Sequence, residues 1–193
     1  MRRTDITLLL GLLTAIAVSS FTGLAAECEE VRGEVLRLHI IPNSDSAADQ
    51  MLKYAIRDRI LIDAADIFAG QDSTGAKELA AQRLGELERI ADEVIAEHGY
   101  TYKSSAVIVN MYFATREYDG GLAAPAGRYD AVRIIIGEGG GQNWWCIMFP
   151  PMCLPAAAGE PAERIEDKLE EIGELRYTPK FAVVEWVESV RNR

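Results

Sequence analysis

The stretch "LRLHIIPNSDSAADQMLKYAIRDRIL", residues 36 to 61, contains a complete transition from strand to helix. Residues 35–41 are a short run rich in branched apolar residues, which predicts a strand. Pro42 ends this run, because proline has no backbone N–H to donate to a sheet. The four residues after the proline carry side-chain oxygens that can cap a helix. We therefore expect a strand that turns at once into a helix over residues 47–69.

The expected helix begins with a cap. Ser46 and Asp49 have the spacing of a capping box, with Asp in place of the usual Glu. Gly70 is a suitable stop. The apolar residues at helical spacing predict a core-facing side made of Met51, Leu52, Ala55, Ile56 and Ile60.

The rest of the chain continues the mixture of helices and strands. Its periodicity predicts a helix over 74–98, strands over 103–113 and 128–139, and an acidic helix over 160–174. The end, residues 176–193, fits a strand, a helix, or one of these running into the other. This order predicts a single α+β domain with a mainly antiparallel sheet covered by helices, preceded by an N-terminal signal segment.

The N-terminus has the order of an export signal. Two arginines precede the apolar run of residues 6–18, and small residues follow as far as Ala26. We expect residues 1–26 to be a signal peptide or a membrane anchor, because the segment is nearly long enough to span a bilayer. Residues 27–193 are then an exported domain. Glu27 makes lipidation of Cys28 a poor alternative.

Composition limits the classes of partner. A chain of 193 residues with 49% hydrophobic content can build a real core. The formal net charge of −10 disfavours binding to nucleic acid or to anionic membrane surfaces, which would repel it. Proteins and small molecules are the better candidates.

The stretch "NWWCIMFPPMC", residues 143 to 153, combines two tryptophans, two cysteines and a proline pair. Export favours a disulfide between Cys146 and Cys153 around the turn at the prolines. Cys28 is then left over, although an exchange of partners stays open. In a strand Trp144 and Trp145 point to opposite faces, so one is expected in the core and the other toward solvent or a partner.

Two further motifs have structural explanations that compete with chemical ones. Polar residues gather where the first strand meets its helix: His39, Asn43, Ser44, Asp45 and Asp49. No Gly-x-Ser-x-Gly motif accompanies them, and the two histidines have no metal-ligand spacing, so we expect no metal, no cofactor and no catalytic set. The glycine-rich "IGEGGGQN" (136–143) is interpreted as a hairpin turn between two strands, because a phosphate loop would open a helix.

Taken together, residues 36–61 and "PAGRYDAVRIIIGEGGGQNWWCIMFPPMC" (125–153) resemble the stage II sporulation protein R family. The resemblance implies a signalling protein and not an enzyme. It implies export into the space between the forespore and mother-cell membranes, and activation of a membrane-embedded aspartic protease that processes the precursor of sigma-E.

On this interpretation the partner-binding residues are those of the turn together with the tryptophans: His39, Asn43, Ser44, Asp45, Asp49, Trp144 and Trp145. The rival hypotheses are an exported cell-envelope hydrolase that uses His39 and nearby carboxylates, and a purely structural envelope protein.

Overall fold

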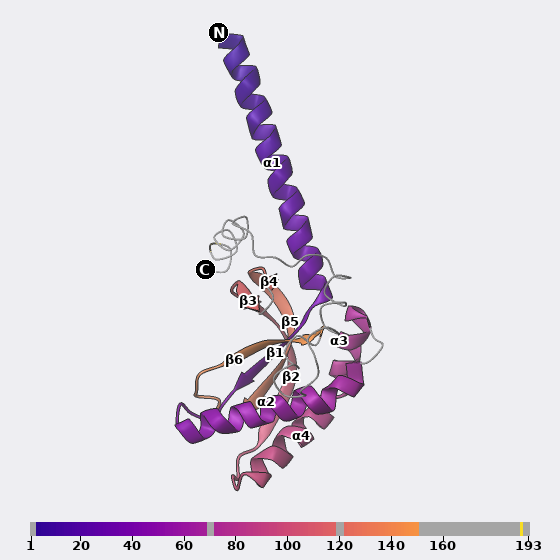
Figure 1. Ribbon diagram of the computed structural model, residues 1–193, viewed down its shortest axis with the longest axis vertical. Coiled ribbons are helices and arrows are strands. Elements are labelled where there is room, and N and C mark those ends of the chain that lie inside the picture. Colours follow the sequence, from indigo (N-terminus) through magenta and orange to yellow (C-terminus); the bar gives the residue numbers. More distant parts are fainter. Residues whose placement is uncertain (1–2, 69–71, 119–121, 151–189, 191–193) are drawn as a thin grey trace.

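The computed structural model describes residues 3–68, 72–118, 122–150 and 190. Within these ranges the chain forms one α+β domain that follows a long N-terminal helix (Figure 1). Its elements are α1 (Arg3–Glu34), β1 (Leu36–Ile41), α2 (Ala47–Phe68), α3 (Ser73–Gln82), α4 (Leu84–Glu97), β2 (Ser104–Phe113), β3 (Arg116–Tyr118), β4 (Leu122–Ala124), β5 (Gly127–Ile136) and β6 (Trp144–Phe149). The predicted fold class is confirmed.

Among the described residues, the main sheet has four strands in the order β2-β5-β1-β6. β1 runs parallel to β5 and antiparallel to β6, and β2 runs antiparallel to β5. Two of the three pairings are therefore antiparallel, as expected. β1 lies inside the sheet, and both of its faces are buried because clusters of side chains cover each side of the sheet.

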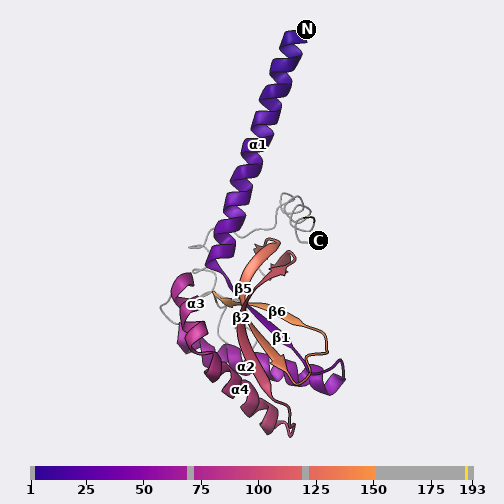
Figure 2. The ribbon, with the colours of Figure 1, turned by 180° about the vertical axis from the view of Figure 1, so that it is seen from behind.

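Helices α2, α3 and α4 cover one face of the sheet (Figure 2). Alternate strand residues point toward them, and Leu38, Ile40 and Ile134 are fully buried there. From α2 the buried contributors are Leu52, Ile56 and Ile60. Burial of one such side chain stabilises the fold by about 1.5–3 kcal/mol. This cluster is larger than the one on the opposite face, so it contributes the larger share of the hydrophobic stabilisation.

The opposite face carries a smaller cluster that includes Val35, Phe113, Tyr129 and Ile147. Val107, Val109, Met111 and Phe113 share one side of β2, as the alternation predicts, and Phe113 is the buried member. Tyr129 donates a hydrogen bond from its hydroxyl to the Pro125 carbonyl at 2.5 Å. This face is therefore partly polar in its interior.

The expected hairpin at the glycine-rich stretch is wrong. β5 and β6 are not neighbours, because β1 lies between them, and the 137–143 loop crosses over the end of β1. Gly137 and Gly139 have positive φ values of 56° and 63°. A Cβ on Gly141 would overlap the backbone of Ser44. The glycines thus allow the close approach of two loops that are remote in sequence.

Three smaller expectations are also corrected. The helix predicted over 74–98 is divided at Arg83, whose φ of −104° and ψ of 11° depart from helical values, and Gly85 beyond it favours helix weakly. β3 and β4 form a short hairpin where a loop was expected. Met51, which was expected in the core, is 68% exposed. One residue turns an α-helix by about 100°, so Met51 points away from the core-facing row that begins at the next residue, Leu52.

Helix α1 continues past residue 26 into the domain. Cys28 is buried, and the Arg32 side chain donates from Nη1 to the Ala126 carbonyl at 2.8 Å. α1 is long and apolar enough to cross a membrane, properties that an N-terminal signal sequence shares. The predicted division at residue 26 stays a prediction, and the expectations for 160–174 and 176–193 lie outside the described residues.

Candidate functional site

The candidate site is the end of the domain where β1 meets α2, and we call residues 42–51 and 137–143 the distal end. Two backbone hydrogen bonds of 3.1 Å join its halves, from Gly140 N to the Asn43 carbonyl and from Gly141 N to the Pro42 carbonyl. Side chains add two more, since Asn43 Oδ1 accepts from Glu138 N at 3.0 Å and Asp45 Oδ1 accepts from Gln142 N at 2.6 Å. The turn and the loop therefore form one unit.

Asp49 holds the turn from inside. Its carboxylate is only 3% exposed and accepts from Asn43 Nδ2 at 3.0 Å and from Ser44 Oγ at 2.5 Å. Its backbone N–H donates to Ser46 Oγ at 3.1 Å, so the serine half of the predicted capping box is confirmed. The other half is absent from the hydrogen bonds of this turn, because the Ser46 N–H donates to Ser44 Oγ instead. Burial alone would raise the pKa of Asp49, but the hydrogen bonds from Ser44, Asn43 and Tyr102 outweigh it and lower the pKa.

Lys53 extends this network beneath the loop. It is 2% exposed, and its Nζ donates to Gln50 Oε1 at 2.5 Å and to the Gln142 carbonyl at 2.9 Å. Burial lowers the pKa of Lys53, and the nearby charge of Asp45 opposes this effect. The lysine thus ties α2 to the crossing loop from the interior.

His39 lies on the helix-free face and not at the surface. It is 2% exposed, and its ring stacks on Trp145 with centroids 3.9 Å apart and 8° between the planes. Arg133 Nε donates to His39 Nδ1 at 3.2 Å. Burial lowers the pKa of His39 to about 4; Asn143 opposes the shift and the charge of Arg133 adds to it. The imidazole is therefore neutral at physiological pH.

The tryptophans point to opposite faces of the sheet, as predicted. Trp144 lies on the helix side, edge-on to Tyr54 at 5.4 Å and beneath the Arg57 guanidinium at 4.8 Å. Trp145 lies on the other side, against His39 and edge-on to Phe113 at 4.9 Å. Both rings are partly buried, so both contribute to packing.

Comparison with known proteins identifies the family of the chain. The family model for stage II sporulation protein R matches residues 32–158, which include every strand described above. The chain belongs to the stage II sporulation protein R family. The resemblance seen in residues 36–61 and 125–153 is confirmed.

A relative from the same family is similar to the greater part of the chain. The protein named stage II sporulation protein R from Bacillus subtilis (strain 168) is 36% identical over 140 residues, which is 70% of this chain and 61% of that relative. The chain thus matches about three fifths of the relative's length. The relative is named as a sporulation protein and not as an enzyme. No solved structure matches the chain.

Among the predicted site residues, the structure brings Asn43, Ser44, Asp45 and Asp49 together at the distal end. His39 and Trp145 form a separate pair on the sheet, and Trp144 belongs to the helix side. Their role in partner binding stays a prediction. Cys146 is buried, whereas Cys153 lies outside the described residues, so the disulfide also stays a prediction.

Sequence reasoning missed three basic residues at or near this site. Lys53 is described above, and Arg133 orients His39. Arg37 is fully buried, with Nε donating to the Cys146 carbonyl at 3.2 Å and its guanidinium 4.3 Å from the centre of the Phe113 ring. Strand alternation places Arg37 and His39 on one face, a signal that could have shown a polar interior there.

In the described part of the chain, no group of three or more His, Cys, Asp or Glu side chains is arranged to hold a metal ion. His39 also lacks the geometry of a general base, since Arg133 already occupies Nδ1. The Ser44 hydroxyl donates to Asp49 and not to a histidine. The arrangement favours a preorganised surface over a catalytic centre.

Proposed function

We propose that the protein is an exported sporulation signal. Its domain acts outside the cytoplasm and activates a membrane-embedded aspartic protease, which then processes the precursor of the mother-cell sigma factor sigma-E. The domain shifts the protease toward an active state through differential binding, and no bond is made or broken by the signal itself.

The observation that carries this proposal is the family match over residues 32–158. The matched region coincides with the folded domain, from the last turn of α1 through β6. The surface expected to contact the protease is therefore part of this domain.

Helix α1 supports the location. Its apolar part precedes the domain and is exposed along its length, as expected for a segment that is read by the export machinery or held in a membrane. Export places the domain in the space between the forespore and mother-cell membranes, where the extracytoplasmic face of the protease is accessible.

The chemistry of the candidate site supports binding over hydrolysis. The rival hydrolase requires His39 as a base, but this ring is buried, neutral and engaged with Arg133. The carboxylate of Asp49 is used by Asn43 and Ser44.

Co-expression of the full chain with the protease and the sigma-E precursor in a non-sporulating host tests the proposal. Processing of the precursor is expected when all three proteins are present and not when the signal is omitted. A control chain without residues 3–26 should accumulate in the cytoplasm and give no processing. Unchanged precursor with an exported, folded signal would contradict the proposal, as would processing without the signal.

A further inference from the structure

The distal end lies opposite the point where α1 joins the domain. β1 starts at Leu36, two residues after α1 ends at Glu34, and runs away from the helix. A strand of six residues spans about 20 Å, so the turn after Ile41 is separated from α1 by the full length of β1. Figure 1 shows α1 leaving one end of the domain and α2 beginning near the other.

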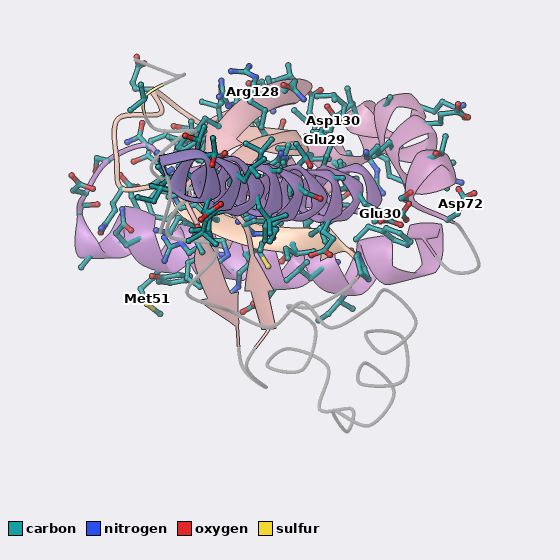
Figure 3. All side chains as sticks on the ribbon, turned by 90° about the horizontal axis from the view of Figure 1, so that it is seen from above. Glu29, Glu30, Met51, Asp72, Arg128 and Asp130 are labelled. Carbon is teal, nitrogen blue, oxygen red and sulfur yellow. The ribbon has the colours of Figure 1, made fainter. Side chains whose placement is uncertain are left out.

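An exposed apolar side chain marks this end. Met51 is 68% exposed, more than any other large hydrophobic side chain of the described residues outside α1. Ala47 and Ala48, one turn earlier on α2, are also exposed. Figure 3 shows Met51 projecting outward from α2. A flexible, polarizable thioether on a surface is well suited to an apolar pocket of a partner.

The backbone beneath this patch is already fixed. Asp49 and Lys53, on either side of Met51 in the sequence, are buried and hydrogen-bonded to the turn and to the loop. A partner that binds here does not have to order the surface first, which lowers the entropic cost of binding.

The exposed charge at the distal end is acidic. Asp45 and Glu138 are exposed, whereas Lys53 is buried beneath them. Lys103, whose carbonyl accepts from Gly137 N, pairs with Asp92 at 3.0 Å. A partner therefore complements this end with a basic side chain next to an apolar pocket.

We infer that the distal end, with Met51 at its centre and Asp45 and Glu138 at its rim, is the docking surface for an extracytoplasmic segment of the membrane-embedded partner, and that this segment presents an apolar pocket and basic side chains. The inference rests on the proposed function and deepens it, since it assigns the contact to α2 and the 137–143 loop. The tryptophans then support the sheet and do not form the contact.

The test uses the full chain in the co-expression assay, with the processed fraction of the precursor as the readout. Met51→Glu places a charge in the apolar contact and is expected to reduce the rate of processing by about tenfold or more. Met51→Leu keeps the apolar volume and should retain processing within about twofold. Glu138→Lys should reduce processing by about three- to tenfold.

Ile62→Glu is the matched control, because Ile62 is 44% exposed on the same helix, away from the distal end. It should process like the parent chain. A photo-cross-linking amino acid at position 51 should capture the co-expressed protease, and one at position 62 should not.

Exported Met51→Glu protein that has the parental melting temperature and processes like the parent would overturn the inference while leaving the proposed function intact. Equal loss in Met51→Glu and Ile62→Glu would also overturn it, because the effect would not be local. Failure of the parent chain itself to cause processing would instead overturn the proposed function, and the docking surface with it.

Discussion

The helix-covered face of the sheet and the distal end are built on different physical principles. The first is an apolar cluster in which Leu38, Ile40 and Ile134 are fully buried against α2 and α4. The second is a small polar unit in which Asn43, Asp49 and their neighbours join two loops by hydrogen bonds. Burial of apolar side chains stabilises the domain. The hydrogen bonds, which are directional, fix the shape of the surface at the distal end.

The largest effect is expected in the apolar face. Leu38→Ala removes a fully buried side chain from the central strand and should lower the free energy of unfolding by about 2–5 kcal/mol. Chemical denaturation measures this loss. If a change at the distal end costs more than Leu38→Ala, the proposed division between the two regions is wrong.

The next effect concerns His39, on the strand that connects the two regions. Its pKa is about 4 in the folded chain and 6.5 in the unfolded chain, so the unfolded state binds more protons between these values. Stability from this group is complete above pH 6.5 and is lost as the pH falls toward 4, by about 3 kcal/mol.

Denaturation at several pH values measures this loss, and His39→Phe is the control, since it keeps an aromatic ring on Trp145 without a titrating group. A parent chain and a variant with equal pH dependence between 6.5 and 4 would contradict the buried, neutral state of the imidazole.

The crossing of the two loops gives a third, smaller effect. A methyl group at position 141 would overlap the Ser44 backbone, so Gly141→Ala should destabilise the chain by about 1–3 kcal/mol. Gly85→Ala has open space in α4 and should stabilise it by up to about 1 kcal/mol. The two substitutions are thus expected to change the free energy of unfolding in opposite directions. A Gly141→Ala variant as stable as the parent chain would contradict the close approach of residue 141 to the turn.

Asp49→Asn tests whether the distal end behaves separately from the sheet, because asparagine has nearly the same shape as aspartate. It weakens the two hydrogen bonds from Asn43 and Ser44 and should cost about 1–2 kcal/mol. Hydrogen exchange should become faster at the amides of the 137–143 loop and stay unchanged in β5. Faster exchange throughout the sheet would mean that the distal end is not a separate unit.

The same network predicts how stability changes at low pH. Because the pKa of Asp49 is lowered in the folded chain, its contribution to stability is complete above the ordinary pKa of an aspartate and is lost as the pH falls below it. Asp49→Asn should remove this component, and the His39 component at higher pH should remain.

Much of the fold could be predicted from local pattern. The strand over 35–41, the cap at Ser46, and the burial of Val132, Ile134 and Ile136 on one side of β5 all follow from periodicity and capping chemistry. The prediction of one continuous helix over 74–98 is wrong, because the apolar residues keep their helical spacing through Arg83. The change of backbone angles at Arg83 does not alter this spacing, so the sequence pattern does not show it.

The site was less accessible to sequence reasoning. The polar residues of the turn were recognised as a group, but the group could be explained equally by capping or by partner binding. Lys53 and Gln142 were missed, because the hydrogen bond between them joins segments 89 positions apart. Met51 was expected in the core, since a helical face defined from sequence has an uncertainty of about one position at its edges.

The sequence alone determined the class of fold, the apolar N-terminal segment, the opposite orientation of the tryptophans and the family. These properties depend on residue type and on contacts within a few positions along the chain. Tertiary structure decided that β1 enters the sheet between β5 and β6, that Asp49 and Lys53 are interior, and that Met51 is exposed. The physical reason is that each of these features depends on which segment, distant in sequence, packs against the residue. Local sequence patterns do not contain this information.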